Sequence, residues 1–186
     1  MLPGYPLILA TSTADGTALT NSTTATSILS STGVGTIPAG ALQIGSQVKM
    51  TLRGRISTTA TTPGTFTVDM RFGTVVVSAL GAINLNTTAQ TNASFELEIL
   101  AVIRSIGSGT SATALVTARF SSRALVGSGT VTASGNGVII LPDTAPAVGT
   151  GFDSTVSNAV NCFGTWSTAS ATSTITVHQS LLELKV

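Results

Sequence analysis

The stretch that decides the fold is Gln47–Ile56, which reads QVKMTLRGRI. Apolar and polar side chains alternate along it, with Val48, Met50, Leu52 and Ile56 on one side and Lys49, Thr51, Arg53 and Arg55 on the other. Successive side chains of a β-strand point to opposite faces, so this period of two predicts a strand with one buried and one solvated face. Gly54 interrupts the pattern, and we expect a bulge or a close backbone approach there.

The same alternation recurs along the chain. It is clear in Thr65–Phe72, Ser94–Arg104 and Thr113–Phe120, and shorter or weaker candidates are Pro6–Ala10, Ala25–Leu29, Val138–Leu141 and Ser173–Leu184. Gly73 and Thr74 separate Thr65–Phe72 from three valines, which predicts a tight hairpin. Short strands punctuated by Gly and Pro are typical of a sandwich or barrel, so we expect one all-β domain of about eight to ten strands.

One predicted strand is apolar on both faces. Phe95, Leu97 and Ile99 lie on one side of Ser94–Arg104, while the other side begins with Glu96 and Glu98 and then turns apolar at Leu100 and Val102. A strand that is apolar on both faces is covered on both sides. We therefore expect a loop or another subunit over the second face.

The composition is unusually poor in charge. Charged residues make up 8% of the 186 residues, against about 25% in an ordinary soluble domain. The chain has 33 threonines and 22 serines, a hydrophobic fraction of 42% and a net charge of +1. This profile excludes common intrinsic disorder and coiled coils, and with no basic stripe it argues against nucleic acid as a partner. A surface with so few charges indicates burial against copies of the chain or a partner.

The residues that carry enzyme chemistry are scarce. The chain has one histidine, His178, and one cysteine, Cys162, so a zinc site and a Ser-His-Asp triad find almost no candidates. Glu96 and Glu98 are spaced like paired carboxylates, but the simpler expectation is a solvated strand face with Arg71, Arg53 or Arg104 as cross-strand partners. Trp166 is expected in the core or an interface. We predict no enzyme activity and no catalytic, cofactor-binding or metal-binding residues, although Asp143 and Asp153 leave calcium open.

The chain divides into two parts at the sequence level. Residues 1–24 contain Pro3 and Pro6 and the small, polar linker Ala10–Thr24, and we expect them to form an arm that orders only against a neighbour. Residues 25–186 then form the sandwich domain. We expect no signal peptide and no membrane-spanning segment, and the single Cys162 fits synthesis in a reducing cytoplasm.

Three segments, taken in order, carry a resemblance to a known family. The loop Thr36–Ser46, TIPAGALQIGS, followed by Val48–Gly54, resembles the IPAG-x-L-x-x-G-[SD] loop and strand of tailed-bacteriophage virion structural proteins. The hairpin Thr67–Val75 resembles their next element, and Trp166–Ser170 with Ile175–Val177 and Glu183-Leu184 resembles their closing strand. The resemblance covers roughly residues 20–186.

This resemblance implies a jelly-roll β-sandwich that assembles as a homotrimer, with residues 1–24 as an arm that docks on a neighbour or the capsid. It implies a capsid decoration, or cement, protein on the outer surface of the phage head, where it bridges capsomers and binds the major capsid protein, with no cofactor, nucleic acid or membrane. Two alternatives stay open: a tail-fibre or receptor-binding module that recognises host glycan, and a self-assembling coat protein. Whether Arg53, Arg55, Arg71, Glu96 and Glu98 face solvent or pair between subunits also stays open at this stage.

Overall fold

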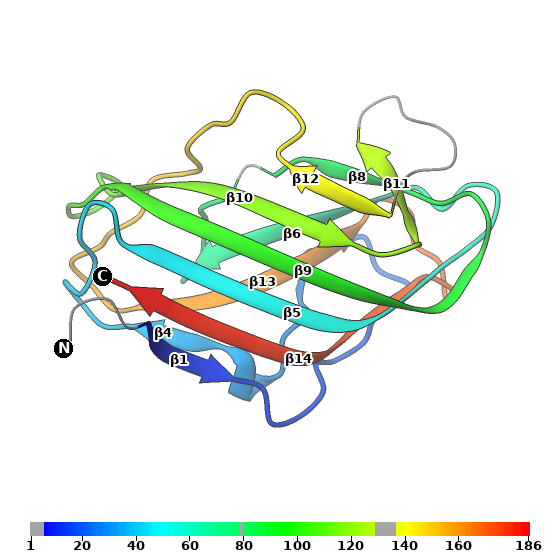
Figure 1. Ribbon diagram of the computed structural model, residues 1–186, viewed down its shortest axis with the longest axis horizontal. Coiled ribbons are helices and arrows are strands. Elements are labelled where there is room, and N and C mark those ends of the chain that lie inside the picture. The colour runs from blue at the N-terminus through cyan, green and yellow to red at the C-terminus, as the bar shows by residue number, and fades with distance from the viewer. Residues whose placement is uncertain (1–5, 79, 129–136) are drawn as a thin grey trace.

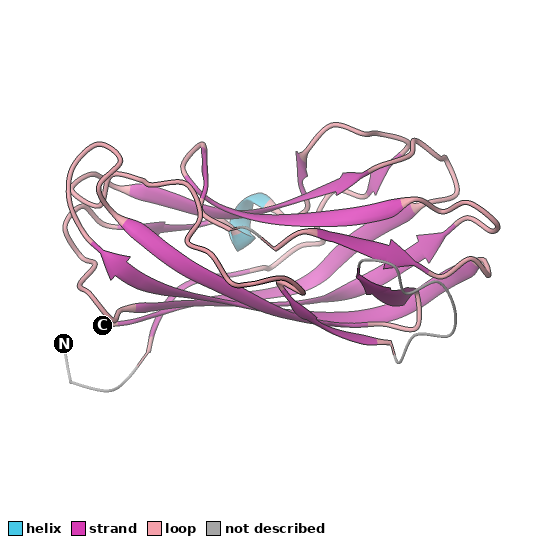
Figure 2. Ribbon diagram, turned by 90° about the horizontal axis from the view of Figure 1, so that it is seen from above, coloured by secondary structure: helices cyan, strands magenta, loops and turns pink. Residues whose placement is uncertain are grey.

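The protein is a β-sandwich. The computed structural model describes residues 6–78, 80–128 and 137–186, and places their strands in two seven-stranded sheets (Figure 1). All pairs of neighbouring strands are antiparallel. The two layers lie face to face when the molecule is seen from above (Figure 2). The predicted all-β sandwich is therefore confirmed.

The first sheet contains the longest strands. Its order is β1-β14-β5-β9-β10-β12, with β2 also paired to β14. The bounds are β1 Leu7–Thr11, β2 Leu19–Thr20, β5 Gln47–Thr58, β9 Gln90–Ser105, β10 Thr113–Ser121, β12 Val138–Leu141 and β14 Thr174–Lys185.

The second sheet has the order β11-β8-β6-β13-β3, with β4 paired to β13 and β7 paired to β6. The bounds are β3 Thr26–Ser27, β4 Gly35–Ile37, β6 Thr65–Phe72, β7 Val75–Val76, β8 Ala82–Leu85, β11 Leu125–Ser128 and β13 Asn158–Trp166. A single 3₁₀ turn, Ser31–Gly33, is the one helical element in the described residues.

The alternating segments fold as predicted. Buried and partly exposed residues alternate along the whole of β6, and the same pattern runs through β5, β9 and β10. The hairpin after β6 turns at Gly73, whose φ of 60° is in the left-handed region that favours glycine. Val75 and Val76 then pair with Phe72 and Arg71. Strands β2, β4, β8, β11 and β13 had no counterpart in the sequence-based prediction, and the described residues form fourteen strands where eight to ten were expected.

The core lies between the inner faces of the two sheets and is organised around aromatic rings. Phe66 packs against Trp166 at 4.6 Å between ring centroids and against Phe120 at 6.5 Å. Trp166 is 1% exposed, and its indole nitrogen donates to the carbonyl oxygen of Leu19 at 3.3 Å. The structure thus places this tryptophan in the core. A second pair, Phe72 and Phe152, meets edge to face at 4.9 Å.

The apolar part of the second face of β9 is half-buried. Leu100 and Val102 are partly buried on the outer face of the first sheet, where they lie opposite Thr117 and Leu115 of β10. Leu115 forms an isolated β-bridge with Val148, which belongs to the loop between β12 and β13. This bridge extends the edge of β10 in the plane of the sheet and leaves both alternatives for the second face of β9, a loop or another subunit, as predictions.

The expected boundary at residue 24 is wrong as a feature of the fold. Residues 7–11 form β1, which pairs with β14 at the edge of the first sheet, and Leu19 is buried. Between them, the Gly16 amide donates to the Val177 carbonyl oxygen at 2.7 Å. This segment finds its partners in its own sandwich because its backbone completes the ladder of β14. A docking role of residues 1–5 lies outside the described residues.

Candidate functional site

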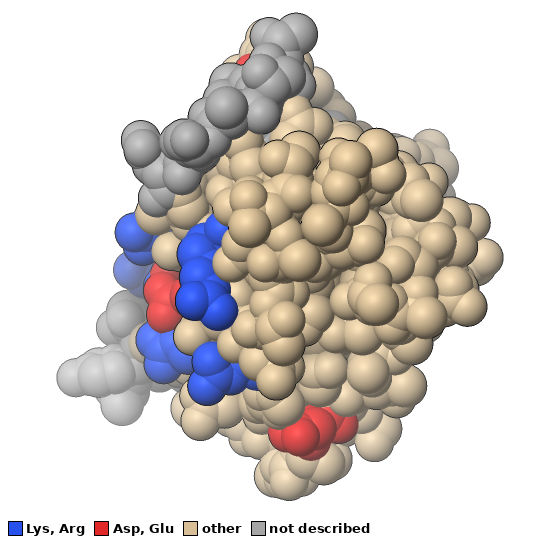
Figure 3. All heavy atoms as spheres, turned by 90° about the vertical axis from the view of Figure 1, so that its right-hand side faces the viewer, with Lys and Arg blue, Asp and Glu red and all other residues tan. Residues whose placement is uncertain are grey.

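Most of the charged side chains lie on one surface, the outer face of the first sheet. They alternate with buried residues along β5, β9, β10 and β14, and are Lys49, Arg53, Arg55, Glu96, Glu98, Arg104, Arg119, Glu183 and Lys185. Figure 3 shows basic side chains gathered along one side of the molecule, while most of that view carries no charge. The outer face of the first sheet is therefore the surface of the described residues with the most groups able to bind a charged or polar ligand.

Two cross-strand ion pairs occupy this face. Arg53 Nε lies 2.8 Å from Glu96 Oε2, and Lys49 Nζ lies 2.8 Å from Glu98 Oε2. All four side chains are at least 41% exposed, so each pair contributes about 0–1 kcal/mol to stability. Because each glutamate has a basic partner, the two do not form an isolated pair of carboxylates. Arg53 and Glu96 thus pair with each other within the chain, and pairing between subunits stays a prediction.

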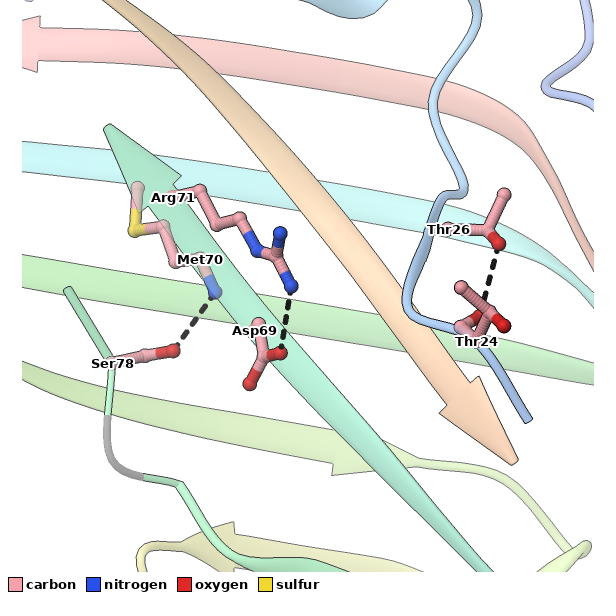
Figure 4. Close-up of polar contacts among 6 residues, drawn as sticks. All are labelled: Thr24, Thr26, Asp69, Met70, Arg71 and Ser78. Atoms are coloured by element: carbon pink, nitrogen blue, oxygen red, sulfur yellow. Dashed lines mark hydrogen bonds and ion pairs between the residues drawn. The ribbon is translucent and has the colours of Figure 1, made fainter. Parts of the chain in front are cut away.

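Two of the predicted partners of these glutamates are wrong. Arg104 follows Glu96 and Glu98 on the same strand, and Arg71 lies on β6 in the other sheet. Arg71 Nη2 instead lies 3.5 Å from Asp69 Oδ2 (Figure 4). Its guanidinium carbon also lies over the ring of Phe163, 4.0 Å from the ring centroid. Asp69 and Arg71 are the charged residues of the described strands of the second sheet, so its outer face is nearly neutral.

An open cleft of about 1090 Å³ lies beside the Arg53–Glu96 pair. It is bordered by the second half of β5, the first half of β9, the loop after β8, the end of β10 with the turn that follows it, and the bulge of β14. Its polar and charged lining residues are Arg53, Arg55, Asn86, Asn92, Ser94, Glu96, Ser121, Ser122, Arg123, His178 and Gln179. Pockets of about 300–1,000 Å³ hold small ligands, so the cleft has room for one.

Two arginines approach the start of β9 from its two sides. Arg55 Nη1 donates to Ser94 Oγ at 2.9 Å and to the Asn92 carbonyl oxygen at 3.3 Å. Arg123 Nη2 donates to the neighbouring carbonyl oxygen of Thr91 at 3.2 Å. Within the described residues, neither guanidinium lies in an ion pair. These contacts fix the direction of both side chains without neutralising their charge.

His178 also lines the cleft. The β14–β5 ladder is irregular between Val177 and Gln179, so His178 is an extra residue in its strand, as in a β-bulge. Its Nδ1 lies 3.0 Å from Asp15 Oδ1, and its side chain is 41% exposed. In the part of the chain that the structure describes, no serine hydroxyl is bonded to this imidazole. The structure therefore does not assemble a Ser-His-Asp arrangement around it.

Cys162 lies on β13 with its side chain in the core. Burial raises the pKa of its thiol far above the ordinary value, and the charge of Asp69 adds to the effect. A thiol in this state is a poor nucleophile and a poor metal ligand because both roles need the thiolate. Among the described residues, no group of three or more His, Cys, Asp or Glu side chains is placed to hold a metal ion.

Three loops meet at the opposite end of the first sheet. Ser154 joins them: its carbonyl oxygen accepts from the Gly40 amide at 3.0 Å, and its own amide donates to the Gly107 carbonyl oxygen at 2.9 Å. These loops carry exposed apolar residues, namely Ile44, Ile106 and Val156, which are 69%, 46% and 50% exposed. We call these three residues the apolar end. The C-terminus lies at this end of the sandwich (Figure 1).

Asp153 organises the same loops. Its carboxylate accepts hydrogen bonds from the Gly109 amide at 2.9 Å and from the Thr155 amide and hydroxyl at 2.8 and 2.6 Å. The hydroxyl of Thr155, followed by the two amides, lowers the pKa of Asp153 from its ordinary 3.8. Asp153 is thus a structural residue of the β12–β13 loop.

Replacing Asp153 with alanine is expected to lower the melting temperature at neutral pH. Because the folded state lowers this pKa, the ionised carboxylate stabilises the fold above the unfolded value near 3.8, and the contribution is lost as the pH falls through the folded value. The difference in melting temperature between wild type and Asp153→Ala should therefore shrink below about pH 4. Thermal unfolding from pH 2 to 7 checks this. Asp153→Asn, which keeps an acceptor but not the charge, is the matched control; a difference that does not change with pH would contradict the assignment.

Comparisons with protein-family models, with curated proteins and with solved structures find no match for this chain. In the described residues, no helix has the length and apolar character needed to cross a bilayer. The functional argument therefore rests on the surfaces themselves.

Sequence reasoning identified part of the cleft. Arg53, Arg55 and Glu96 were singled out as a polar strand face, and His178 as a strand residue. Arg123, Asn86 and Asn92 were missed because they lie in turns or at a strand start, far apart in sequence. The available signal was their position at strand ends, where the loops of a sandwich gather.

Proposed function

We propose that the protein is a non-enzymatic structural protein of a phage virion, a capsid decoration protein that assembles as a homotrimer. The observation that carries this proposal is the apolar end. Ile44, Ile106 and Val156 expose large side chains on three loops that hydrogen bonds hold together. Exposed apolar residues held in a fixed arrangement are typical of a protein–protein contact. We assign this contact to copies of the chain.

The strand connections support a jelly-roll as the specific form of the sandwich. Consecutive described strands change sheet eight times, namely at β2–β3, β4–β5, β5–β6, β8–β9, β10–β11, β11–β12, β12–β13 and β13–β14. Repeated crossing of this kind is what two Greek keys wound together require. The resemblance of Thr36–Gly54 and Thr67–Val75 to tailed-phage virion proteins supports the same proposal.

The low charge fits the mechanical role. A decoration protein stabilises a shell by burying surface across the joints between capsomers, and specific interfaces bury about 1,200–2,000 Å² in total. Contacts made by apolar and hydrogen-bonding groups resist salt better than exposed ion pairs do. Many identical contacts on one shell then add through avidity.

Light scattering of the purified chain tests the assembly. We expect a stable species of three times the 18.6 kDa chain mass at two protein concentrations and in high salt. The double variant Ile44→Asp/Ile106→Asp should give the single-chain mass with unchanged circular dichroism, because a buried carboxylate is costly at an interface. Ile140→Asp, at a residue that is 61% exposed on the edge strand β12, is the matched control and should stay trimeric.

Three results would overturn this proposal. A monomeric wild type would remove the trimer, very large particles would indicate the self-assembling coat protein, and dissociation by Ile140→Asp alone would move the contact away from the apolar end. Antibodies against the chain should label the heads of virions from its source. Label confined to the tail tips would favour the receptor-binding alternative.

A further inference from the structure

The cleft at the far end of the first sheet is more basic than the molecule as a whole. Its lining contains three arginines and one glutamate, whereas the whole chain has a net charge of +1. The glutamate, Glu96, is already paired with Arg53. Arg55 and Arg123 remain as two positive charges with no acidic partner in the described residues. An anion entering the cleft would therefore meet two guanidinium groups.

The two guanidinium groups also have donors to spare. A guanidinium carries five N–H donors, and the structure uses only Nη1 of Arg55 and Nη2 of Arg123. The bonds that they do form, to the start of β9, restrict the side chains before any ligand arrives. Such preorganisation lowers the entropic cost of binding. Carboxylate and phosphate groups match the planar fork of arginine.

The neutral part of the lining fits hydroxyl groups. The cleft contains the side chains of Asn92, Gln179, Ser94 and Ser121 beside the arginines. The side-chain amides of Asn92 and Gln179 form no hydrogen bond to another described residue, so each offers both donors and an acceptor. A ligand that carries many hydroxyls along with its acidic groups would satisfy both parts of the lining.

We propose that this cleft binds an acidic oligosaccharide, with carboxylate or phosphate groups paired to Arg55 and Arg123 and sugar hydroxyls bonded to the amides and serines. The proposal goes beyond the structural role above and does not depend on the oligomeric state. The apolar end and this cleft lie at opposite ends of the first sheet. Contact between copies through the apolar end therefore leaves the cleft accessible.

The lining disfavours two other anionic ligands. Single-stranded nucleic acid binds by stacking bases on aromatic side chains, and the one aromatic residue in this lining, Phe95, is 4% exposed. Peptides are usually anchored by apolar side chains in pockets, and the cleft offers chiefly charged, amide and hydroxyl groups. An acidic sugar chain needs neither feature.

Isothermal titration calorimetry at low ionic strength tests the proposal. The probes are a galacturonic acid hexamer, a phosphorylated pentamannose and a neutral glucose hexamer. We expect binding of at least one acidic sugar, weakening with added salt, and no binding of the neutral one. Comparing the affinities of the galacturonic acid hexamer and the phosphorylated pentamannose shows whether the cleft prefers carboxylate or phosphate groups. Arg55→Ala and Arg123→Ala should each weaken binding about 10- to 100-fold, as expected for a hydrogen bond to a charged group.

Two further variants separate the cleft from general charge. Arg104→Ala removes an exposed arginine of the same sheet face that does not line the cleft, so its affinity should equal that of wild type. Ser121→Trp should block binding while every charge remains. Equal losses in Arg104→Ala and Arg123→Ala, or binding to neither acidic sugar, would overturn the proposal. Tighter binding of a glutamate hexamer or a thymidine oligonucleotide would overturn the carbohydrate assignment.

Discussion

Replacing Trp166 with alanine is expected to lower the free energy of unfolding by about 3–5 kcal/mol, the usual range for removing a large aromatic side chain from a core. Trp166 is 1% exposed, lies 4.6 Å from the ring of Phe66 and donates to the carbonyl oxygen of Leu19. The variant loses the ring packing, and the Leu19 carbonyl loses a donor. Urea unfolding followed by circular dichroism gives the measurement.

Two comparison variants separate the contributions of ring packing, the hydrogen bond and burial to this loss of stability. Trp166→Phe keeps an aromatic ring against Phe66 but removes the hydrogen bond to Leu19, so it should cost less than Trp166→Ala. Phe163→Ala removes an aromatic side chain from the same strand, but on the partly exposed outer face, and should also cost less. A loss below about 1 kcal/mol for Trp166→Ala would show that the core does not depend on this ring.

Replacing Gly54 with alanine should be the second most damaging single change that we expect. A Cβ at Gly54 would overlap the backbone carbonyl of Thr176 on β14 and would lie 2.8 Å from the Phe95 ring. The β14 backbone cannot move away from Gly54 without breaking its backbone hydrogen bonds to β5. Overpacking usually costs about 1–3 kcal/mol, and an overlap with backbone belongs at the upper end of this range.

The control for Gly54→Ala is Thr51→Ala, on the outer face of the same strand, where a smaller side chain meets no obstruction. It should change the free energy of unfolding by less than about 1 kcal/mol. If Gly54→Ala matched this control, β14 would have to be freer to move than its pairing with β5 implies. The expectation of a close approach at Gly54, drawn from the sequence alone, is confirmed by the structure.

The strands that the sequence predicts are those whose buried face is uniformly apolar. In β6, and in β5 from Val48 to Ile56, every second residue is large and apolar or glycine, so the period of two is visible without structural information. In β13 the inward residues include Asn158, Cys162 and Gly164, while Phe163 points outward. Its two faces therefore differ little in hydropathy, and the strand was missed although it is central to the second sheet.

Contacts between residues that lie far apart in the sequence were the other feature that the sequence did not predict. Nothing in the local sequence distinguishes Arg71 from Arg53 as a partner of Glu96, because the choice depends on which sheet each strand joins. The same holds for residues 11–20, whose mostly small side chains predict little. Their backbone completes the edge of the first sheet through hydrogen bonds that any side chain permits. The cleft could not be predicted from the sequence for the same reason, because its lining residues come from segments that are far apart in the chain.

The burial of Cys162 makes the protein well suited to site-specific labelling. It is the only cysteine in the sequence, and its thiol is enclosed in the core with a raised pKa, so maleimide reagents should leave the native protein unmodified. A cysteine introduced on the surface would then be the single reactive thiol, with no need to mutate the native one. Fluorophores at Ile106 and at Ser121 would report separately on the two ends of the sandwich.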